Sequence, residues 1–209
     1  MTVPTGTALV VHDLKNALGA LEGALAQLVG QPSEAGARAA WRQCTELRHR
    51  MVTFLALYGE GGVLRARCDD ESPAELLQAL QRRHADNPRG IEIGLASLDA
   101  APPFCYLDRR LVDLALDAAL HNALRFARAR IVLSAAQDGA ELVLAVDDDG
   151  PGLEPAWSAA RPPDACATGL GTALCRAVAT AHGSTRADGG IVLANRPAGG
   201  ARFELRLPT

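Results

Sequence analysis

The first thirty residues contain a regular repeat of apolar side chains at alternating intervals of three and four residues. The members of the repeat are Val11, Leu14, Leu18, Leu21, Leu25 and Leu28. This spacing brings all of them to one side of an α-helix. We therefore predict a helix over residues 5–30, which ends at Gly30-Gln31-Pro32-Ser33 because glycine and proline interrupt helices.

A second helix is predicted over residues 34–58, since apolar side chains recur on one face there as well. They are Trp41, Cys44, Leu47, Met51, Leu55 and Tyr58. The two helices form a hairpin, but a hairpin alone cannot bury two apolar faces. Pairing of two hairpins in a homodimeric four-helix bundle is the simplest solution. Packing of the hairpin on the rest of its own chain is the alternative.

Beyond the glycine-rich stretch at residues 59–62, shorter helices and strands alternate. Helices are expected at residues 73–84, 108–128 and 171–181, and strands at residues 91–95, 130–134, 141–146, 191–194 and 201–207. This pattern predicts an α/β sandwich with one mixed or antiparallel sheet under helices. The chain is therefore expected to be an α+β protein with two domains, residues 1–62 and 63–209.

The composition of the 209 residues narrows the functional class. The net charge of −3 argues against a dedicated nucleic-acid-binding protein, which is usually basic. The five cysteines lie far apart without a Cys-x-x-Cys pair, so we expect reduced, mostly buried thiols, no zinc site and a cytoplasmic location. Since neither a signal peptide nor an apolar run of bilayer length is evident, no membrane anchor is expected.

His12 lies off the apolar face of the first predicted helix, with Asp13 beside it and Asn16 one turn further on. The four-residue spacing puts His12 and Asn16 on one outward face. A solvent-exposed imidazole next to a carboxylate suits nucleophilic chemistry, because neutral histidine is a competent nucleophile near physiological pH. The alternative is an ordinary surface histidine on an amphipathic helix.

Two glycine-rich motifs lie in the second half of the chain. Asp148-Asp149-Gly150-Pro151-Gly152 follows a predicted strand, where glycine lets the backbone approach a ligand and Asp148 supplies a hydrogen-bond acceptor. Thr168-Gly169-Leu170-Gly171 opens a predicted helix, whose first N–H groups would cradle phosphate. An acidic surface turn and an ordinary helix start are the alternatives.

Asn122 lies on the predicted helix of residues 108–128, which carries apolar residues nearly all round and should be largely buried. A buried carboxamide needs hydrogen-bond partners. Asn122 would either cap neighbouring backbone groups or hold Mg²⁺ beside phosphates through its side-chain oxygen.

The order of these motifs resembles that of the bacterial sensor histidine kinases. His12-Asp13-Leu14-Lys15-Asn16 is similar to the phosphoacceptor box of the family, and Asn122-Ala123, with Asp108 and Leu111 upstream, is similar to its N box. The motif at residues 148–153 resembles the first glycine box. The motif at residues 168–171, followed by Ala181-His182-Gly183, resembles the second. Residues 189–190 and 199–203 resemble the closing hairpin of the same fold, so the resemblance covers nearly the whole chain.

The resemblance implies a dimerisation and histidine-phosphotransfer hairpin in residues 1–62 and an ATP-binding domain of the type shared with gyrase and Hsp90 in residues 63–209. It implies that His12 accepts the γ-phosphoryl group of ATP, that Asp13 takes its proton, and that Asn16 orients a water molecule against a phosphorylated response regulator. Asn122 would bind Mg²⁺, and Asp148 would bind the adenine amino group. The other nucleotide-binding residues implied by the resemblance are Gly150, Gly152, Thr168, Gly169, Leu170 and Gly171.

The implied function is that of a two-component histidine kinase core that forms a homodimer and phosphorylates the receiver domain of a response regulator. Because almost nothing precedes His12, a separate sensor protein is expected to deliver the stimulus. Three departures from the family pattern are Ala118 in place of Asn or Glu, Ala167 in place of the first glycine of the second box, and a short segment before Thr168 with Trp157 as its only aromatic residue. They favour the alternative of a phosphotransfer or adaptor protein on a degenerate kinase scaffold. A serine kinase acting as an anti-sigma factor ranks last, since it does not need an exposed His-Asp pair.

Overall fold

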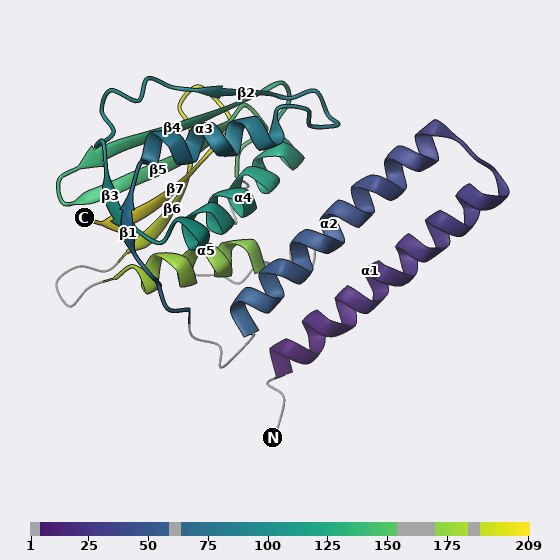
Figure 1. Ribbon diagram of the computed structural model, residues 1–209. Helices are drawn as coiled ribbons and strands as arrows, with labels where there is room; N and C mark the ends of the chain where they lie inside the picture. The colour runs from purple at the N-terminus through teal and green to yellow at the C-terminus, as the bar shows by residue number, and fades with distance from the viewer. Residues whose placement is uncertain (1–4, 59–63, 154–169, 184–188) are drawn as a thin grey trace. The chain divides into compact units, whose positions relative to one another are not determined.

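The computed structural model describes residues 5–58, 64–153, 170–183 and 189–209, and the chain divides into two compact units, Met1–Val63 and Leu64–Thr209. The first unit is a helical hairpin of α1 (Thr5–Gly30) and α2 (Glu34–Tyr58), as Figure 1 shows. Both helices have the predicted bounds. Ser33 begins α2, because its Oγ accepts a hydrogen bond from the Gly36 N–H at 3.1 Å and so satisfies a donor of the first turn.

Only half of the apolar repeat of α1 lies inside the hairpin. The inner row is Leu14, Leu21 and Leu28, which pack with Ala40 and Leu47 of α2. The outer row is Val11, Leu18 and Leu25, which are 50%, 47% and 49% exposed. Both rows have a seven-residue period, so α1 carries two adjacent apolar seams of the kind found in helical bundles. Of the six apolar positions predicted on α2, only Leu47 is buried.

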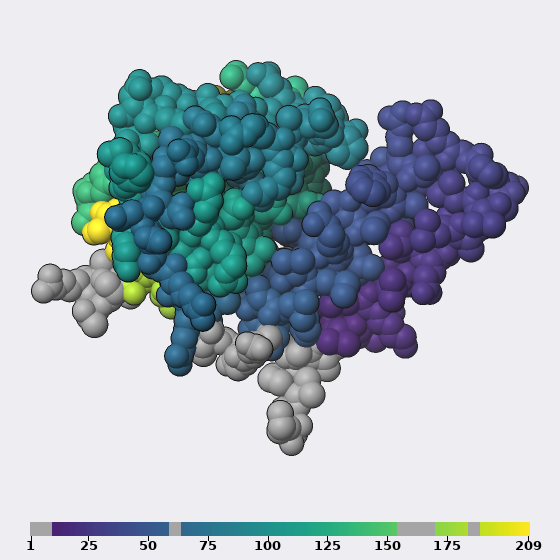
Figure 2. Space-filling model, viewed as in Figure 1, coloured from purple at the N-terminus to yellow at the C-terminus, as the bar shows by residue number. Residues whose placement is uncertain are grey.

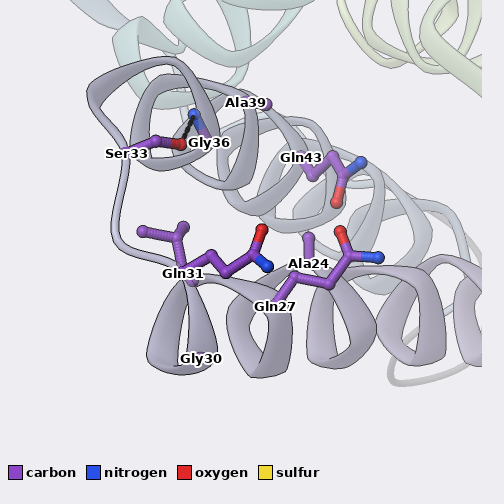
Figure 3. Close-up of a pocket in the computed structure, with 9 residues that line it drawn as sticks. Ala24, Gln27, Gly30, Gln31, Ser33, Gly36, Ala39 and Gln43 are labelled. Carbon is purple, nitrogen blue, oxygen red and sulfur yellow. Dashed lines mark hydrogen bonds between the residues drawn. The ribbon is translucent and has the colours of Figure 1, made fainter.

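A groove between α1 and α2 opens toward the loop of the hairpin. It has a volume of about 750 Å³ and is lined by Ala24, Gln27, Leu28, Gly30, Gln31, Ser33, Gly36, Ala39 and Gln43. Figure 3 shows the carboxamides of Gln27 and Gln43 on opposite walls, and Figure 2 shows openings between the side chains of the two helices there. Small residues line both walls, among them Ala24 of α1 and Gly36 and Ala39 of α2.

The second unit has a five-stranded sheet and a two-stranded sheet. The large sheet has the order β2-β4-β5-β7-β6, and only the β2–β4 pair is parallel. Its strands are β2 (Glu92–Leu95), β4 (Arg130–Asp138), β5 (Glu141–Asp148), β6 (Gly190–Asn195) and β7 (Ala201–Pro208). The helices α3 (Pro73–His84), α4 (Arg109–Phe126) and α5 (Leu170–Ala181) cover one face of it (Figure 1). This arrangement confirms the predicted α+β class and the mixed sheet under helices.

The core lies between that face of the sheet and the three helices. Leu144 and Leu205 of neighbouring strands and Leu116 of α4 are completely buried. The opposite face of the sheet is covered by an ion-pair ladder on β7, in which Arg202 and Arg206 both bond to Glu204. Asp147 joins this ladder through Arg202, but burial of its carboxyl group outweighs the two nearby arginines and raises the pKa of Asp147.

A buried histidine, His182, connects the beginning of α4 to the end of α5. The Asp108 N–H donates to Nε2 of His182 at 2.9 Å, and His182 Nδ1 therefore carries the proton that it donates to the Val178 carbonyl at 2.8 Å. Asp108 also caps α4, since its Oδ1 accepts from the Leu111 N–H. His182 thus holds the end of α5 against the beginning of α4.

Two short strands were not predicted from the sequence. β1 (Asp69–Glu71) and β3 (Cys105–Leu107) pair antiparallel in a separate sheet. Three residues are too few to show an alternating pattern. The β4–β5 hairpin is longer than predicted, and its turn contains Gly139 at φ +59°.

The prediction of mostly buried cysteines was only partly right. Cys105 and Cys175 are buried, and burial raises the pKa of the Cys175 thiol to about 12. Cys44 is exposed and Cys68 half-buried, while Cys166 lies outside the described residues. None of the helices in the described part of the chain has the length and apolar character needed to cross a bilayer.

Candidate functional site

The turn after β5 presents one carboxylate oxygen in a fixed orientation. Asp148 is 7% exposed, and its Oδ1 accepts hydrogen bonds from the Gly150 N–H at 2.7 Å and the Ala201 N–H at 3.2 Å. Among the described residues, no donor bonds to the other oxygen, Oδ2. This carboxylate oxygen is therefore free to accept a hydrogen bond from a ligand or from water.

One side of α4 forms a wall beside this turn. Ala118, Asn122 and Phe126 lie on successive turns of the helix; Ala118 is buried, whereas Asn122 and Phe126 are exposed. A Cβ at Gly171, in the first turn of α5, would lie 3.5 Å from Nδ2 of Asn122. A Cβ at Gly150 would lie only 2.7 Å from the carbonyl oxygen of Phe126, so this position needs glycine. The α4 wall therefore joins the start of α5 to the turn after β5.

The prediction that Asn122 is buried was wrong. The side chain is exposed, because α5 begins at Leu170 and covers α4 only as far as the level of Gly171. Within the described residues, the Asn122 side chain makes no hydrogen bond to a backbone group, and its carboxamide is open to solvent next to the first turn of α5. The capping alternative for Asn122 therefore has no support.

The remaining predicted nucleotide residues differ in burial and in backbone conformation. Leu170 is 5% exposed and packs in the core, so only its backbone is available to a ligand. Gly152 has φ +84°, a backbone conformation that favours glycine. Thr168 and Gly169 lie outside the described residues, as do Ala167 and Trp157.

Arg125 and Phe126 extend the α4 wall and were not singled out from the sequence. Both are exposed, and the Arg125 guanidinium carbon lies 5.5 Å from the centre of the Phe126 ring. The Arg125 carbonyl oxygen accepts from the guanidinium of Arg89. In the sequence, the one indication that they could belong to the site is their position one helical turn after Asn122. That position does not distinguish them from ordinary surface residues.

Asp149 has a structural task that the sequence did not reveal. Its carboxylate accepts hydrogen bonds from the backbone N–H groups of Arg128, Ala129 and Arg130, at 2.8–3.2 Å. Partial desolvation opposes ionisation, but these hydrogen bonds outweigh it and lower the pKa of Asp149. Asp149 thereby anchors the end of α4 to the turn that carries Asp148.

Replacing Asp149 with Ala is expected to lower the free energy of unfolding by about 1–2 kcal/mol at pH 7, because backbone hydrogen bonds to a partly exposed carboxylate are lost. A lowered folded-state pKa makes this contribution fully present above the unfolded-state pKa of about 3.9 and removes it as the pH falls further. Urea unfolding of the full chain at pH 7 and pH 3 measures both effects. Asp86→Ala, at an exposed aspartate, is the control, and an equal loss in the two variants would contradict this role.

His12 is exposed on the first unit, and the Nδ1 edge of its ring faces two polar side chains of α1, Asp13 and Asn16. Nδ1 lies 3.2 Å from Nδ2 of Asn16 and 3.8 Å from Oδ1 of Asp13. The His12 side chain is 66% exposed, and no described residue bonds to Nε2. His12 lies on the side of α1 opposite the inner row, so hairpin packing leaves Nε2 accessible.

Residues 107–209 match the family described as histidine kinase-, DNA gyrase B- and HSP90-like ATPases. The sensor protein KdpD of Escherichia coli (strain K12) is 38% identical over 114 residues, which are 49% of this chain and 12% of that protein. The sensor-type histidine kinase PrrB of Mycobacterium tuberculosis (strain H37Rv) is 32% identical over 150 residues, which are 67% of this chain and 32% of PrrB. The chain thus spans a third or less of either relative.

The structure of the Acinetobacter baumannii histidine kinase AdeS has the same fold, with a TM-score of 0.69 over 94% of this chain and 97% of that one at 22% identity. Residues 107–209 therefore belong to the histidine kinase, gyrase B and HSP90 ATPase family. Taken with the sensor-kinase relatives, the chain resembles the catalytic core of histidine kinases, with an ATPase domain of this type in residues 107–209.

Proposed function

We propose that this chain binds ATP with its second unit, phosphorylates His12, and passes the phosphoryl group to an aspartate of a response regulator receiver domain. The observation that carries the proposal is the Oδ2 atom of Asp148, which has no donor among the described residues and belongs to a turn that lies against α4. A free carboxylate oxygen suits an amino group of a ligand, and the first turn of α5, on the other side of Asn122, suits its phosphates.

The residues of the site fit ATP and Mg²⁺. Asp148 Oδ2 would accept a hydrogen bond from the adenine amino group, which is the only part of adenine that donates at that edge. The phosphates would lie at the first turn of α5, where free N–H groups and the helix dipole favour anions. Asn122 faces the same turn, and its Oδ1 is a ligand suited to Mg²⁺. The ion would neutralise charge on the phosphates.

His12 would be the nucleophile in this reaction. In the reacting tautomer, Nδ1 would carry the proton and direct it toward Asp13, so the Asn16 amide would have to turn its Nδ2 away from Nδ1. Nε2 would then present a lone pair to the γ-phosphorus. An N–P bond forms, the bond from the γ-phosphorus to the bridging oxygen breaks, and ADP leaves. The phosphorylated imidazolium then loses its Nδ1 proton to Asp13. The 3.8 Å separation of Nδ1 and Asp13 Oδ1 would shorten to a hydrogen bond as positive charge develops on the ring.

Asn16 is proposed to act in the dephosphorylation of the response regulator, in which water attacks the phosphoaspartate and inorganic phosphate leaves. Its carboxamide lies on the same face as His12 and has no useful proton to exchange, so its role would be to position a water molecule in line with a phosphoryl group. A regulator docked over His12 would bring its phosphoaspartate within reach of both side chains.

Incubation of the full chain with γ-labelled ATP and Mg²⁺ tests the proposal. The expected product is labelled protein whose label is lost in acid and survives in alkali, as a phosphoramidate requires. An acid-stable label would indicate a hydroxyl acceptor and would contradict the assignment to histidine.

The second candidate is a phosphotransfer or adaptor protein without its own kinase activity. It is favoured by Ala118, whose Cβ lies 3.9 Å from the Cβ position of Gly171 and offers no polar group beside the phosphate end of the site. ATP binding without labelling, together with transfer of label from a phosphorylated receiver domain to His12, would select this candidate.

A homodimer is proposed on the basis of the outer row of α1 and the groove beside it. We expect Leu18→Glu to convert a dimer into a monomer at micromolar concentration, since burying one leucine contributes about 1.5–3 kcal/mol and each dimer contains two copies. Sedimentation velocity measures the change. Ala20→Glu places the same charge on an exposed position of α1 away from the outer row and should leave the dimer intact. A monomeric wild-type chain would overturn the proposal.

A further inference from the structure

The segment from Asn195, at the end of β6, to Ala201, at the start of β7, is here called the β6–β7 turn. This turn contacts the Asp148–Leu153 segment at three separate points. The Arg196 guanidinium donates to the backbone carbonyl of Asp148 at 2.8 Å. The Ala201 N–H donates to Asp148 Oδ1 at 3.2 Å. Asn195 bonds to both backbone groups of Leu153: its Oδ1 accepts from the Leu153 N–H, and its Nδ2 donates to the Leu153 carbonyl at 3.1 Å. The turn therefore holds the segment at its beginning and at its end.

Two glycines make this close approach possible. A Cβ at Gly200, which has φ +88°, would lie 1.9 Å from the Asp148 carbonyl oxygen. A Cβ at Gly152 would lie 2.6 Å from Oδ1 of Asn195. Neither position can take a side chain unless the turn and the segment separate. The glycine at residue 152 thus serves the Asn195 contact as well as its own backbone conformation.

We infer that Asn195 is a positioning residue for base recognition: by holding Leu153 it keeps Asp148 Oδ2 in the orientation that selects an amino group over a carbonyl at the 6-position of a purine. This inference rests on the proposed function. Asn195 does not touch the base and acts only through the backbone. The orientation of Oδ2 follows because Oδ1 is already bonded to two N–H groups, one of which belongs to the turn. Release of the turn frees the carboxylate to rotate.

A carboxylate oxygen aimed at the 6-position discriminates strongly between purines. The 6-amino group of adenine donates to it, whereas the 6-oxo group of hypoxanthine is an acceptor and leaves two oxygens facing one another. A site built around one hydrogen bond rejects the analogue that lacks the donor far better than an apolar site does. A carboxylate that rotates loses this selectivity along with affinity.

The test compares Asn195→Ala with a matched control, Asn87→Ala. Asn87 makes the same pair of bonds elsewhere in the unit: its Oδ1 accepts from the Ile91 N–H at 3.0 Å, and its Nδ2 donates to the Ile91 carbonyl at 2.7 Å and also to the His84 carbonyl at 3.3 Å. Asn87→Ala should therefore lower the melting temperature at least as much as Asn195→Ala does. Dissociation constants for ADP and for inosine diphosphate, both with Mg²⁺, are measured by calorimetry on the full chain and on both variants.

The wild-type chain is expected to prefer ADP to inosine diphosphate by at least about tenfold. In Asn195→Ala, the dissociation constant for ADP should rise about tenfold and the preference should fall toward unity, whereas Asn87→Ala should keep both values of the wild type. Unchanged affinity and preference in Asn195→Ala, or equal changes in the two variants, would overturn the inference. Failure of the wild-type chain to bind either nucleotide would instead refute the proposed function itself.

Discussion

Replacement of His12 by Gln is expected to abolish phosphoryl acceptance while leaving nucleotide binding intact. Glutamine keeps a polar side chain of similar length but has no nitrogen lone pair that can attack phosphorus. His12 lies on the first unit, whereas the proposed nucleotide residues belong to the second. Labelling from γ-labelled ATP should fall to background. The dissociation constant for ADP should stay within about twofold of that of the wild type, because the substitution removes none of the proposed nucleotide-binding side chains.

Asn16→Ala is the matched variant for this experiment. It removes the neighbouring polar side chain of the same face and should leave labelling of His12 within a few-fold of normal, while slowing the decay of the phosphorylated regulator. Label that persists in His12→Gln would identify another acceptor and would point to the serine-kinase alternative. Equal decay of the regulator with the wild type and with Asn16→Ala would show that Asn16 is an ordinary surface residue.

Asp148→Asn is expected to weaken ADP binding by at least about tenfold, because a hydrogen bond to a charged acceptor contributes about 1.5–3 kcal/mol. The asparagine Oδ1 can still accept from Gly150 and Ala201, which preserves the turn. Its Nδ2 then replaces Oδ2 and meets the adenine amino group donor to donor. Calorimetry with ADP and Mg²⁺ measures the loss, and thermal unfolding shows whether the fold is intact.

The control for Asp148 is Asp138→Asn, which removes the same charge at the opposite end of the β4–β5 hairpin. Asp138 is exposed and pairs with Arg206, so its loss should leave the affinity for ADP unchanged. Unchanged affinity in Asp148→Asn would place nucleotide binding elsewhere in the chain. A comparable loss in both variants would indicate a general electrostatic effect rather than recognition of the base.

Helices were more predictable than the details of the site because their signals are local. The 3,4 spacing of α1 and α2 and the cap residue Ser33 act within one or two turns. β1 and β3 were missed because each has only three residues and is stabilised by a partner more than thirty positions away. The prediction that Asn122 is buried failed because the position at which α5 begins, and not the composition of α4, decides which turns of α4 are covered.

The sequence by itself determined the order of helices and strands, the hairpin, and the identity of His12, Asn122 and Asp148 as candidate residues. Those features depend on periodicity and on motifs that are short in sequence. Only the tertiary structure decided which apolar row of α1 faces α2, which oxygen of Asp148 remains without a donor, and that Asn195 holds Leu153. These depend on contacts between residues far apart in the chain, such as the pair 42 positions apart formed by Asn195 and Leu153. Strand register and helix packing set such distances, and no local pattern encodes them.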